Sequence, residues 1–175
     1  MNIAIISDSH DNLTNIYKAL DWMNKNEVRE IIHCGDICAP GALREIANNF
    51  KGEIHIVYGN VDGDREGMEQ IAIEAGNVII YGETGEIISK KQQNKKTIKQ
   101  FKIAFTHFPW TAKNLAKTGK YHYVFYGHTH KPWEESCGNC KIINPGTLAG
   151  MFYKATFAIF NTESEELSLK ILEKL

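Results

Sequence analysis

The sequence is poor in cysteine and proline, and it contains no long apolar run. Its 175 residues include four cysteines and four prolines. A disulfide-stabilised scaffold would be shorter and richer in cysteine. No apolar run approaches the ~18–20 residues of a membrane-spanning helix. The chain starts in strand-like sequence rather than with a basic, cleavable leader. We therefore expect a cytoplasmic protein with no membrane partner.

An excess of charge of either sign is also missing. The chain has 20 basic and 21 acidic side chains, and 43% of its residues are hydrophobic. A disordered chain would be less apolar or more highly charged. The balanced charge gives no general reason to expect nucleic acid as a partner. Length and composition suit a single domain spanning residues 1–175.

One segment departs from this balance, because Lys90–Lys102 carries six lysines and no acidic residue. We interpret it as a solvated loop or hairpin tip between two strands. Contact with nucleic acid or an anionic substrate is the alternative, although no aromatic stacking pattern accompanies the lysines.

Strand-like and helical stretches alternate in the first half of the chain. The apolar runs are Ile3–Ile6, Ile31–Ile32 and Ile54–Tyr58, and the helical stretches are Leu13–Asn24, Pro40–Asn49 and Glu66–Ala75. Asn12 is a plausible N-cap of the first helix, and Pro40 suits the first turn of the second. This βαβαβα order predicts an α/β fold with a largely parallel sheet.

Short strands dominate the second half. They are expected at Val78–Tyr81, Glu86–Ile88, Phe101–Phe105, Tyr123–Tyr126, Trp133–Ser136, Lys141–Ile143, Thr156–Phe160 and Leu167–Ile171, with one helix at Ala112–Lys117. Turn signals between them favour antiparallel meanders. We expect a second, more mixed sheet that packs against the first.

Metal-capable side chains follow five of these apolar runs. They are Asp8, His10, Asp36, Asn60, His107, His128 and His130. Sites in parallel α/β sheets form outside the carboxyl ends of the strands. We therefore expect these side chains to converge.

Their chemistry restricts what they can bind. Carboxylate, amide and imidazole donors without thiolate suit Mn, Fe, Zn or Ni better than a structural zinc site. Seven ligands exceed the needs of one tetrahedral ion but fit two ions bridged by a carboxylate, and Asp36 is central among them. Two such ions ~3.5–4 Å apart can hold a bridging hydroxide for in-line attack on phosphorus. The sequence has neither a Gly-x-x-x-x-Gly-Lys-Ser/Thr loop nor a Gly-x-Ser-x-Gly elbow, which argues against nucleotide-driven phosphoryl transfer and an α/β-hydrolase.

The motifs around these residues resemble those of the calcineurin-like metallophosphoesterases, most closely the small single-domain bacterial and archaeal phosphodiesterases. They are Asp8-Ser9-His10, Gly35-Asp36, Gly59-Asn60-Val61-Asp62, Thr106-His107, Gly127-His128-Thr129-His130 and Asn144-Pro145-Gly146-Thr147. The resemblance runs from Asn2 to about Phe160. It implies a four-layer α/β/β/α sandwich of two mixed sheets flanked by helices, as in metallo-dependent phosphatases.

The resemblance also implies a function and a set of ligands. Asp8, His10 and His130 would hold one divalent ion, Asn60, His107 and His128 the other, and Asp36 would bridge them. We expect a hydrolase of small phosphate esters, phosphodiesters above all, in which Asp36 and Asn60 position the metals and the phosphate. Manganese is the expected metal, with Fe, Zn or Ni as alternatives, and a homo-oligomer is left open.

Two departures from the family pattern bear on the substrate. Val61 stands where many members have a histidine that acts as general acid. We therefore expect good leaving groups to be preferred, or a proton to come from a metal-bound water or from Asp62. Phe108-Pro109-Trp110 stands where the family usually has glycine after the histidine. Such bulk would narrow the pocket or place an aromatic face over a substrate ring.

The remaining histidines and the cysteines are interpreted more simply. His33 either orients a ligand or is an ordinary near-core residue, whereas His55 is read as structural and His122 as a surface residue. Cys137-Gly138-Asn139-Cys140 resembles half of a zinc ribbon, with Cys34 and Cys38 as further thiols. Reduced thiols are favoured over an extra zinc or a redox role.

Two other functions compete with phosphoester hydrolysis. One is a non-catalytic scaffold of the same fold that binds protein partners, as a eukaryotic retromer subunit does. The retention of all seven ligands argues against it. The other is a nuclease, which only the lysine-rich segment Lys90–Lys102 supports.

Overall fold

The computed structural model describes residues 1–94 and 97–175, and of these it leaves the side chains of 91–94 and 97–99 undescribed. Its first sheet has the strand order β11-β10-β1-β2-β3-β4. The parallel strands are β1 (Asn2–Ile6), β2 (Val28–His33), β3 (Glu53–Ile56) and β4 (Val78–Ile80), and the antiparallel ones are β10 (Thr156–Asn161) and β11 (Glu166–Ile171).

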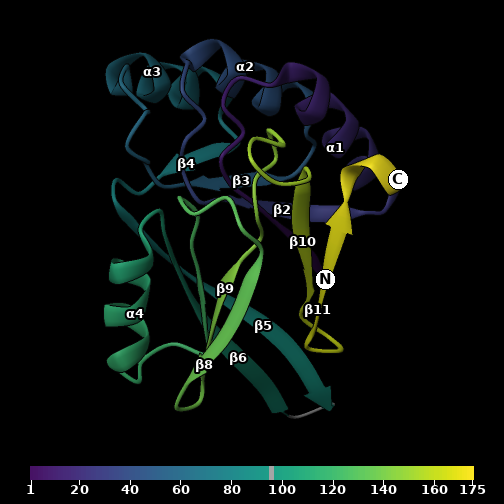
Figure 1. Cartoon of the computed structure of the whole chain (residues 1–175). Coiled ribbons are helices and arrows are strands. Elements are labelled where there is room, and N and C mark those ends of the chain that lie inside the picture. Colours follow the sequence, from purple (N-terminus) through teal and green to yellow (C-terminus); the bar gives the residue numbers. More distant parts are fainter. Residues whose placement is uncertain (95–96) are drawn as a thin grey trace.

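Three helices connect the parallel strands and cover the outer face of this sheet (Figure 1). They are α1 (Leu13–Lys25), α2 (Pro40–Asn49) and α3 (Arg65–Ala75). The predicted βαβαβα order is confirmed, with element ends shifted by a few residues. Asn12 caps α1 as expected, because its side-chain oxygen accepts a hydrogen bond from the backbone N–H of Asn15.

The second sheet has the order β5-β6-β7-β9-β8. Its strands are β5 (Thr84–Asn94), β6 (Thr97–Thr106), β7 (Tyr123–Phe125), β8 (Trp133–Cys137) and β9 (Cys140–Asn144), with α4 (Pro109–Lys117) between β6 and β7. A 3₁₀ turn, η1 (Leu172–Lys174), follows β11.

The prediction of antiparallel meanders is wrong in two respects. β6, β7 and β9 are parallel neighbours. α4 provides the crossover from β6 to β7, and the chain passes through β8 before it reaches β9. β10 and β11 belong to the first sheet, where β10 pairs with β1. The β5–β6 pairing agrees with the hairpin interpretation of the lysine-rich segment. Residues 95 and 96, at its centre, lie outside the described residues.

Three apolar clusters separate four layers, as the expected α/β/β/α sandwich requires. Side-chain alternation along β1 assigns Ala4 and Ile6 to the cluster under α1–α3, and Ile3 and Ile5 to the cluster between the two sheets. Aromatic side chains fill the intersheet cluster, namely Phe101, Phe105, Phe125 and Phe160. A third cluster joins α4 to the outer face of the second sheet. None of the described helices combines the length and apolar character that a bilayer span requires.

Candidate metal centre

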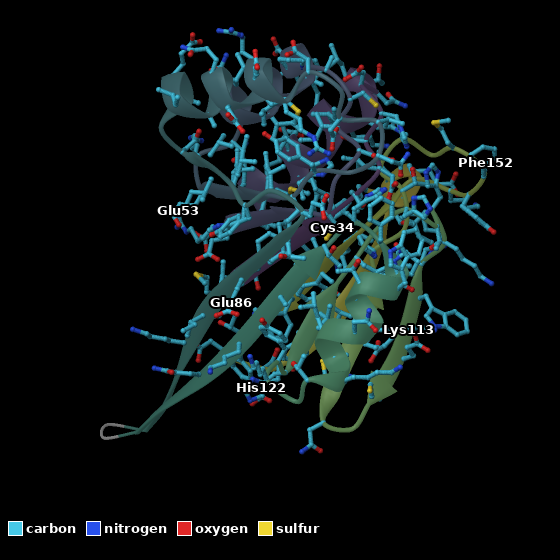
Figure 2. All side chains as sticks on the ribbon, turned by 90° about the vertical axis from the view of Figure 1, so that its left-hand side faces the viewer. Cys34, Glu53, Glu86, Lys113, His122 and Phe152 are labelled. Carbon is cyan, nitrogen blue, oxygen red and sulfur yellow. The ribbon has the colours of Figure 1, made fainter. Side chains whose placement is uncertain are left out.

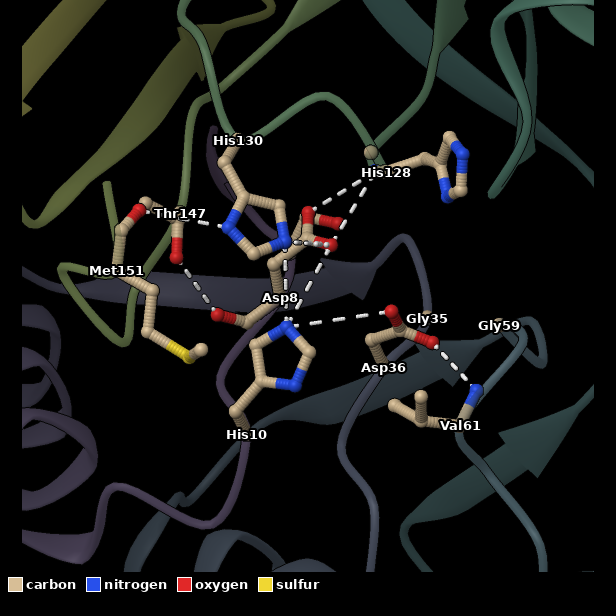
Figure 3. Close-up of polar contacts among 12 residues, drawn as sticks. Asp8, His10, Gly35, Asp36, Gly59, Val61, His128, His130, Thr147 and Met151 are labelled. Carbon is tan, nitrogen blue, oxygen red and sulfur yellow. Dashed lines mark hydrogen bonds and ion pairs between the residues drawn. The ribbon is translucent and has the colours of Figure 1, made fainter. Parts of the chain in front are cut away.

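The seven predicted ligands lie together where the carboxyl ends of strands from both sheets meet. Asp8, Asp36 and Asn60 follow β1, β2 and β3 of the first sheet, and the histidines at 107, 128 and 130 follow β6 and β7 of the second. Figure 3 shows Asp8, His10, Asp36 and His130 facing one another, with Asp8 and His10 on the loop after β1 and the other two on two further loops. The seven side chains that were expected to converge therefore lie close together, as a shared metal centre would require.

One group of donors is formed by Asp8, His10 and His130. The Nε2 atoms of the two histidines lie 3.3 Å apart, and His130 Nε2 lies 3.3 Å from Asp8 Oδ1. His10 Nε2 is 4.0 Å from the same carboxylate oxygen. This spacing suits three ligands facing one ion.

A second group is formed by Asn60, His107 and His128. Asn60 Oδ1 lies 3.0 Å from His107 Nε2 and 2.9 Å from His128 Nδ1, and these two ring nitrogens are 3.2 Å apart. The group combines one amide oxygen with two imidazole nitrogens. The ring of Phe108 does not prevent His107 from reaching it.

Asp36 stands between the two groups. Its Oδ2 atom lies 3.4 Å from His107 Nε2 and 4.0 Å from His10 Nε2. Its other oxygen, Oδ1, accepts a hydrogen bond from the backbone N–H of Val61 at 3.0 Å (Figure 3). One carboxylate oxygen is thus within reach of ligands from both groups.

Five of the seven predicted ligands have backbone in the left-handed region. Asp8, His10, Asp36, His128 and His130 have φ values of 52°, 42°, 60°, 68° and 60°. Such conformations cost about 1–3 kcal/mol each in a non-glycine residue and are retained where the surrounding structure enforces them. Five such conformations lie at one site, and clusters of this kind are typical of functional sites.

Tight backbone packing explains two glycines of the motifs. A Cβ atom on Gly59 would lie 2.0 Å from Asp36 Oδ1, and one on Gly127 would lie 1.9 Å from Ser7 Oγ. Any side chain at these positions would displace the loop that carries Asp36 or the one that carries His128. Both glycines are therefore required by space.

Contacts outside the two groups orient the histidine rings. His107 Nδ1 lies 2.8 Å from the carbonyl oxygen of Cys34, so donation there leaves Nε2 with its lone pair facing Asn60. His130 Nδ1 lies 3.4 Å from the carbonyl oxygen of Met151, and His10 Nδ1 lies 3.4 Å from Cys38 Sγ. No sequence motif predicts the contact of the Met151 carbonyl with His130 or that of Cys38 with His10. A short loop after Asn144-Pro145-Gly146-Thr147 was the only available signal for Met151.

Asp62 contributes to the loops rather than to either group. Its buried carboxylate accepts backbone N–H hydrogen bonds from Asp36 at 2.9 Å, Cys38 at 2.8 Å and Gly59 at 2.7 Å. Both carboxylate oxygens of Asp62 are thus occupied by backbone donors from the loops after β2 and β3. These contacts favour a positioning role over the predicted role as a proton source.

The electrostatics of the site fit divalent cations. Burial raises the pKa of Asp8, against the smaller opposing effects of Ser7, His107 and His130. Burial also opposes the ionisation of Asp36, but the His107 ring and the Val61 N–H outweigh it and lower the pKa of Asp36. Burial disfavours the charged His107 ring, yet the bond to Asp36 raises the pKa of His107. Two ions on this oxygen and imidazole donor set would supply the charge that the buried carboxylates need.

The histidines outside the ligand set have separate roles. His33 is buried, with Nε2 2.9 Å from Ser9 Oγ and Nδ1 accepting the Gly35 N–H at 3.2 Å. Burial lowers the pKa of His33 to about 4, so the ring is neutral. The ring links the loop after β1, through Ser9, to the loop after β2, through Gly35. Both loops carry predicted ligands, so these contacts favour an orienting role for His33. His55 is buried against Tyr81 as expected, and exposed His122 lies well away from Cys34 (Figure 2).

The cysteines do not assemble into a four-thiolate site among the described residues. Every metal-capable group found in this part of the chain is built from aspartate and histidine. Cys137 and Cys140 face each other at the end of the β8–β9 hairpin, and all four cysteines are free. Burial raises the pKa of Cys140 to about 11, in keeping with an inert thiol.

Comparisons with known proteins agree with this geometry. A model of the calcineurin-like phosphoesterase superfamily domain matches residues 1–165. A phosphodiesterase of Methanocaldococcus jannaschii is 34% identical over 176 residues, which cover 99% of this chain and 100% of that protein. The solved structure of an archaeal phosphodiesterase is similar with a TM-score of 0.84 at 30% identity, covering 98% of this chain and 99% of that one. Vps29 of Entamoeba histolytica, solved in complex with zinc, has a TM-score of 0.63 at 18% identity, covering 97% and 96%, and this likeness concerns the fold alone.

Proposed function

The chain belongs to the calcineurin-like phosphoesterase superfamily and is a metal-dependent phosphoesterase, and from this premise we propose that it hydrolyses phosphodiesters with two divalent cations. The curated relative and the similar solved structure are both named as phosphodiesterases. They support a diester as substrate.

The position of Asp36 carries the proposal. Its Oδ2 atom lies 3.4 Å from His107 Nε2 and 4.0 Å from His10 Nε2, so it can serve both donor groups. Asp8, His10 and His130 would hold one ion, and Asn60, His107 and His128 the other. Bound there, two divalent cations supply Lewis-acid polarisation of the phosphate and a nucleophile at neutral pH, as in other two-metal sites. Manganese is the proposed metal, with Fe, Zn and Ni as alternatives that accept the same donors.

The chain's own residues orient the reaction. Buried Asp8 and Asp36 and the carbonyl-anchored His107 would hold the cations, which in turn would attract the phosphate oxygens. We propose in-line attack at phosphorus, because two neighbouring donor groups suit the two-metal arrangement that supports it. Asn60 faces both His107 and His128 and would orient the phosphate beside them.

This chain has no general acid for the leaving group at position 61, where many relatives have a histidine. Val61 offers only an apolar side chain there, and its backbone N–H is engaged with Asp36. Asp62 is held by three backbone donors. The enzyme should therefore favour esters of acidic alcohols and phenols, which depart without a proton.

Chelation and reconstitution test the proposed function. The protein would be stripped with EDTA and assayed on bis(p-nitrophenyl) phosphate before and after addition of Mn²⁺, Zn²⁺, Ni²⁺ or Fe²⁺. Turnover should vanish on stripping and return with at least one metal. Asp36→Asn keeps the shape of the side chain and should lower kcat/KM by more than about 100-fold. Replacing a residue that only hydrogen-bonds to a metal ligand already costs about 10- to 100-fold.

An exposed aspartate provides the matched control. Asp21 lies on α1 in an exposed ion pair with Lys25, and Asp21→Asn should leave kcat/KM unchanged. Activity that survives stripping, or near wild-type turnover by Asp36→Asn, would refute the dimetal proposal. A folded, metal-loaded protein with no turnover on any diester or monoester would favour the scaffold function instead.

A further inference from the structure

Two aromatic rings form a stack at the rim of the metal centre. The rings of Phe108 and Trp110 lie 4.6 Å apart between centroids, with only 16° between their planes. They follow directly after His107, in the turn that leads into α4. We refer to Phe108 and Trp110 as the aromatic stack.

The local backbone holds the stack in place. Phe108 is the N-cap of α4, with extended φ and ψ values of −91° and 136°, and Pro109 occupies the first helical turn. Proline fixes its own φ and restricts the residue before it to extended conformations. The backbone that carries the two rings is therefore arranged before any ligand binds, which reduces the entropic cost of binding.

The two rings differ in what they contact. The Phe108 ring meets the rings of His107 and His128 edge-on, at centroid distances of 5.0 and 5.1 Å. The Trp110 ring lies 5.7 Å from His128 and is 57% exposed. Phe108 thus shields the histidines, whereas Trp110 presents an uncovered aromatic surface beside the same donor group.

Shielding of His107 and His128 does not account for Trp110. Phe108 already contacts both histidines. Trp110 meets the His128 ring only edge-on and keeps more than half of its surface exposed, which a side chain that served only to exclude water would not do. An indole more than half exposed to solvent retains apolar surface that a ligand can cover. Because the Trp110 ring lies 5.7 Å from the His128 ring, one substrate molecule could contact both the indole and the metal centre.

We propose that the aromatic stack is a nucleobase-binding subsite, so that the substrates are phosphodiesters of nucleosides. This inference rests on the proposed phosphodiesterase function. A base would stack on Trp110 while its phosphate lies among the ligands, and such stacking contributes about 1–3 kcal/mol per base. Neither ring offers a hydrogen-bond acceptor, and the indole N–H is the only donor. The subsite therefore selects a planar ring without reading which base it belongs to.

Paired substrates with one leaving group test the subsite. The p-nitrophenyl ester of thymidine 5′-monophosphate and methyl p-nitrophenyl phosphate would be assayed with the Mn²⁺-reconstituted enzyme. The wild type should prefer the thymidine ester by about 5- to 150-fold in kcat/KM, the range that corresponds to 1–3 kcal/mol. Trp110→Leu keeps apolar bulk but removes the ring, and should abolish the preference through a higher KM. Trp110→Phe keeps a stacking face and should retain most of it.

Trp133 provides a matched control, because it is also half exposed but lies on β8. Trp133→Leu should retain the preference. Binding is followed independently by quenching of tryptophan fluorescence with thymidine 5′-monophosphate, which Trp110→Leu should lose. Turnover of the methyl ester reports on the proposed function, so its loss is distinguishable from loss of the subsite.

Three outcomes would overturn the proposal while the enzyme remains active. These are equal kcat/KM for the two esters in the wild type, an equal loss on both esters in Trp110→Leu, and an unchanged preference in that variant. An equal loss would mean that the stack serves the p-nitrophenyl group or the metal ligands. An unchanged preference would place the base elsewhere.

Discussion

The carboxylate of Asp62 accepts a hydrogen bond of 2.9 Å from the backbone N–H of Asp36, the residue that stands between the two donor groups. The same carboxylate also accepts from the N–H groups of Cys38 and Gly59. One buried side chain therefore ties together the loops after β2 and β3. It holds the loop that carries Asp36, the residue that we propose as the bridging ligand.

Replacement of Asp62 tests this positioning role. Asp62→Asn should lower the free energy of unfolding by about 1–3 kcal/mol, because an amide group cannot accept all three backbone donors. Urea denaturation measures the loss, with Asp21→Asn as the exposed control. If Asp62 instead donates the leaving-group proton, the variant will keep its stability and lose activity most on esters with basic leaving groups.

The leaving-group dependence follows from Val61. With a series of substituted phenyl methyl phosphates, kcat should fall steeply as the pKa of the phenol rises. Val61→His places an imidazole where many relatives have one, and should raise the rate on the poorest leaving groups by about 10-fold or more, since a positioned general acid contributes up to 10²–10⁴-fold. Val61→Ile is the apolar control. A flat dependence in the wild type would contradict this prediction.

Metal stoichiometry distinguishes the two donor groups. His107→Ala removes a nitrogen within 3.2 Å of both Asn60 and His128. It should reduce the bound metal from about two ions per chain to about one. His122→Ala, at an exposed position, should leave two. Elemental analysis after gel filtration measures both, and two ions retained by His107→Ala would contradict the assignment of His107.

Crowding at Gly59 predicts a sharp contrast with a nearby glycine. A Cβ atom on Gly59 would overlap Asp36 Oδ1, whereas one on Gly63 has no neighbour within 4 Å. Gly59→Ala should destabilise the protein by about 1–3 kcal/mol and displace Asp36. Gly63→Ala should be neutral or stabilising by up to about 1 kcal/mol. Thermal unfolding and metal affinity compare the two variants, and equal behaviour would contradict the close packing.

The stability of the protein should depend on pH through His55. Burial lowers the pKa of His55 below 6.5, and the effect of Glu53 only partly opposes this. The unfolded chain therefore takes up the proton first. The stability contribution is intact above pH 6.5 and is lost as the pH falls through 6.5 toward the folded-state pKa. The expected slope is at most about 1.4 kcal/mol per pH unit.

His55→Gln should reduce this dependence, because an amide has no proton to gain in that range. Buried His33, whose pKa burial lowers to about 4, keeps its own contribution in the variant. Glutamine also retains the ability to bond to Tyr81, which lies 3.0 Å from His55 Nδ1. His122→Gln, at an exposed position, is the control. Urea unfolding at several pH values between 5 and 8 measures the slope, and an unchanged slope in His55→Gln would exclude His55 as its source.

Much of the fold and the site could be predicted from local features. The apolar run Ile3–Ile6, the cap at Asn12 and the proline at 40 each report on their own neighbourhood, and the structure confirms the elements they predict. The positions of the predicted ligands could also be inferred from local sequence. Parallel strands end at one edge, so a residue such as Asp36 could be placed by counting from its strand.

Strand partners could not be predicted in this way. Thr156–Phe160 is a short apolar run that fits either sheet, and it joins β1 because the first sheet has a free edge there. The parallel order of β6, β7 and β9 depends on where α4 packs. Such pairings are decided by contacts between residues distant in the chain, on which local propensity has no bearing.

The roles of Asp62 and Trp110 were likewise decided by the tertiary structure. Local sequence determined which donor atoms this protein has and which strand ends carry them, because those depend on residue type and on the period of the strands. Whether a carboxylate faces a phosphate or three backbone N–H groups depends on loops brought together from different strands. The same holds for an indole, which becomes a binding surface only where the fold leaves its face uncovered beside the site.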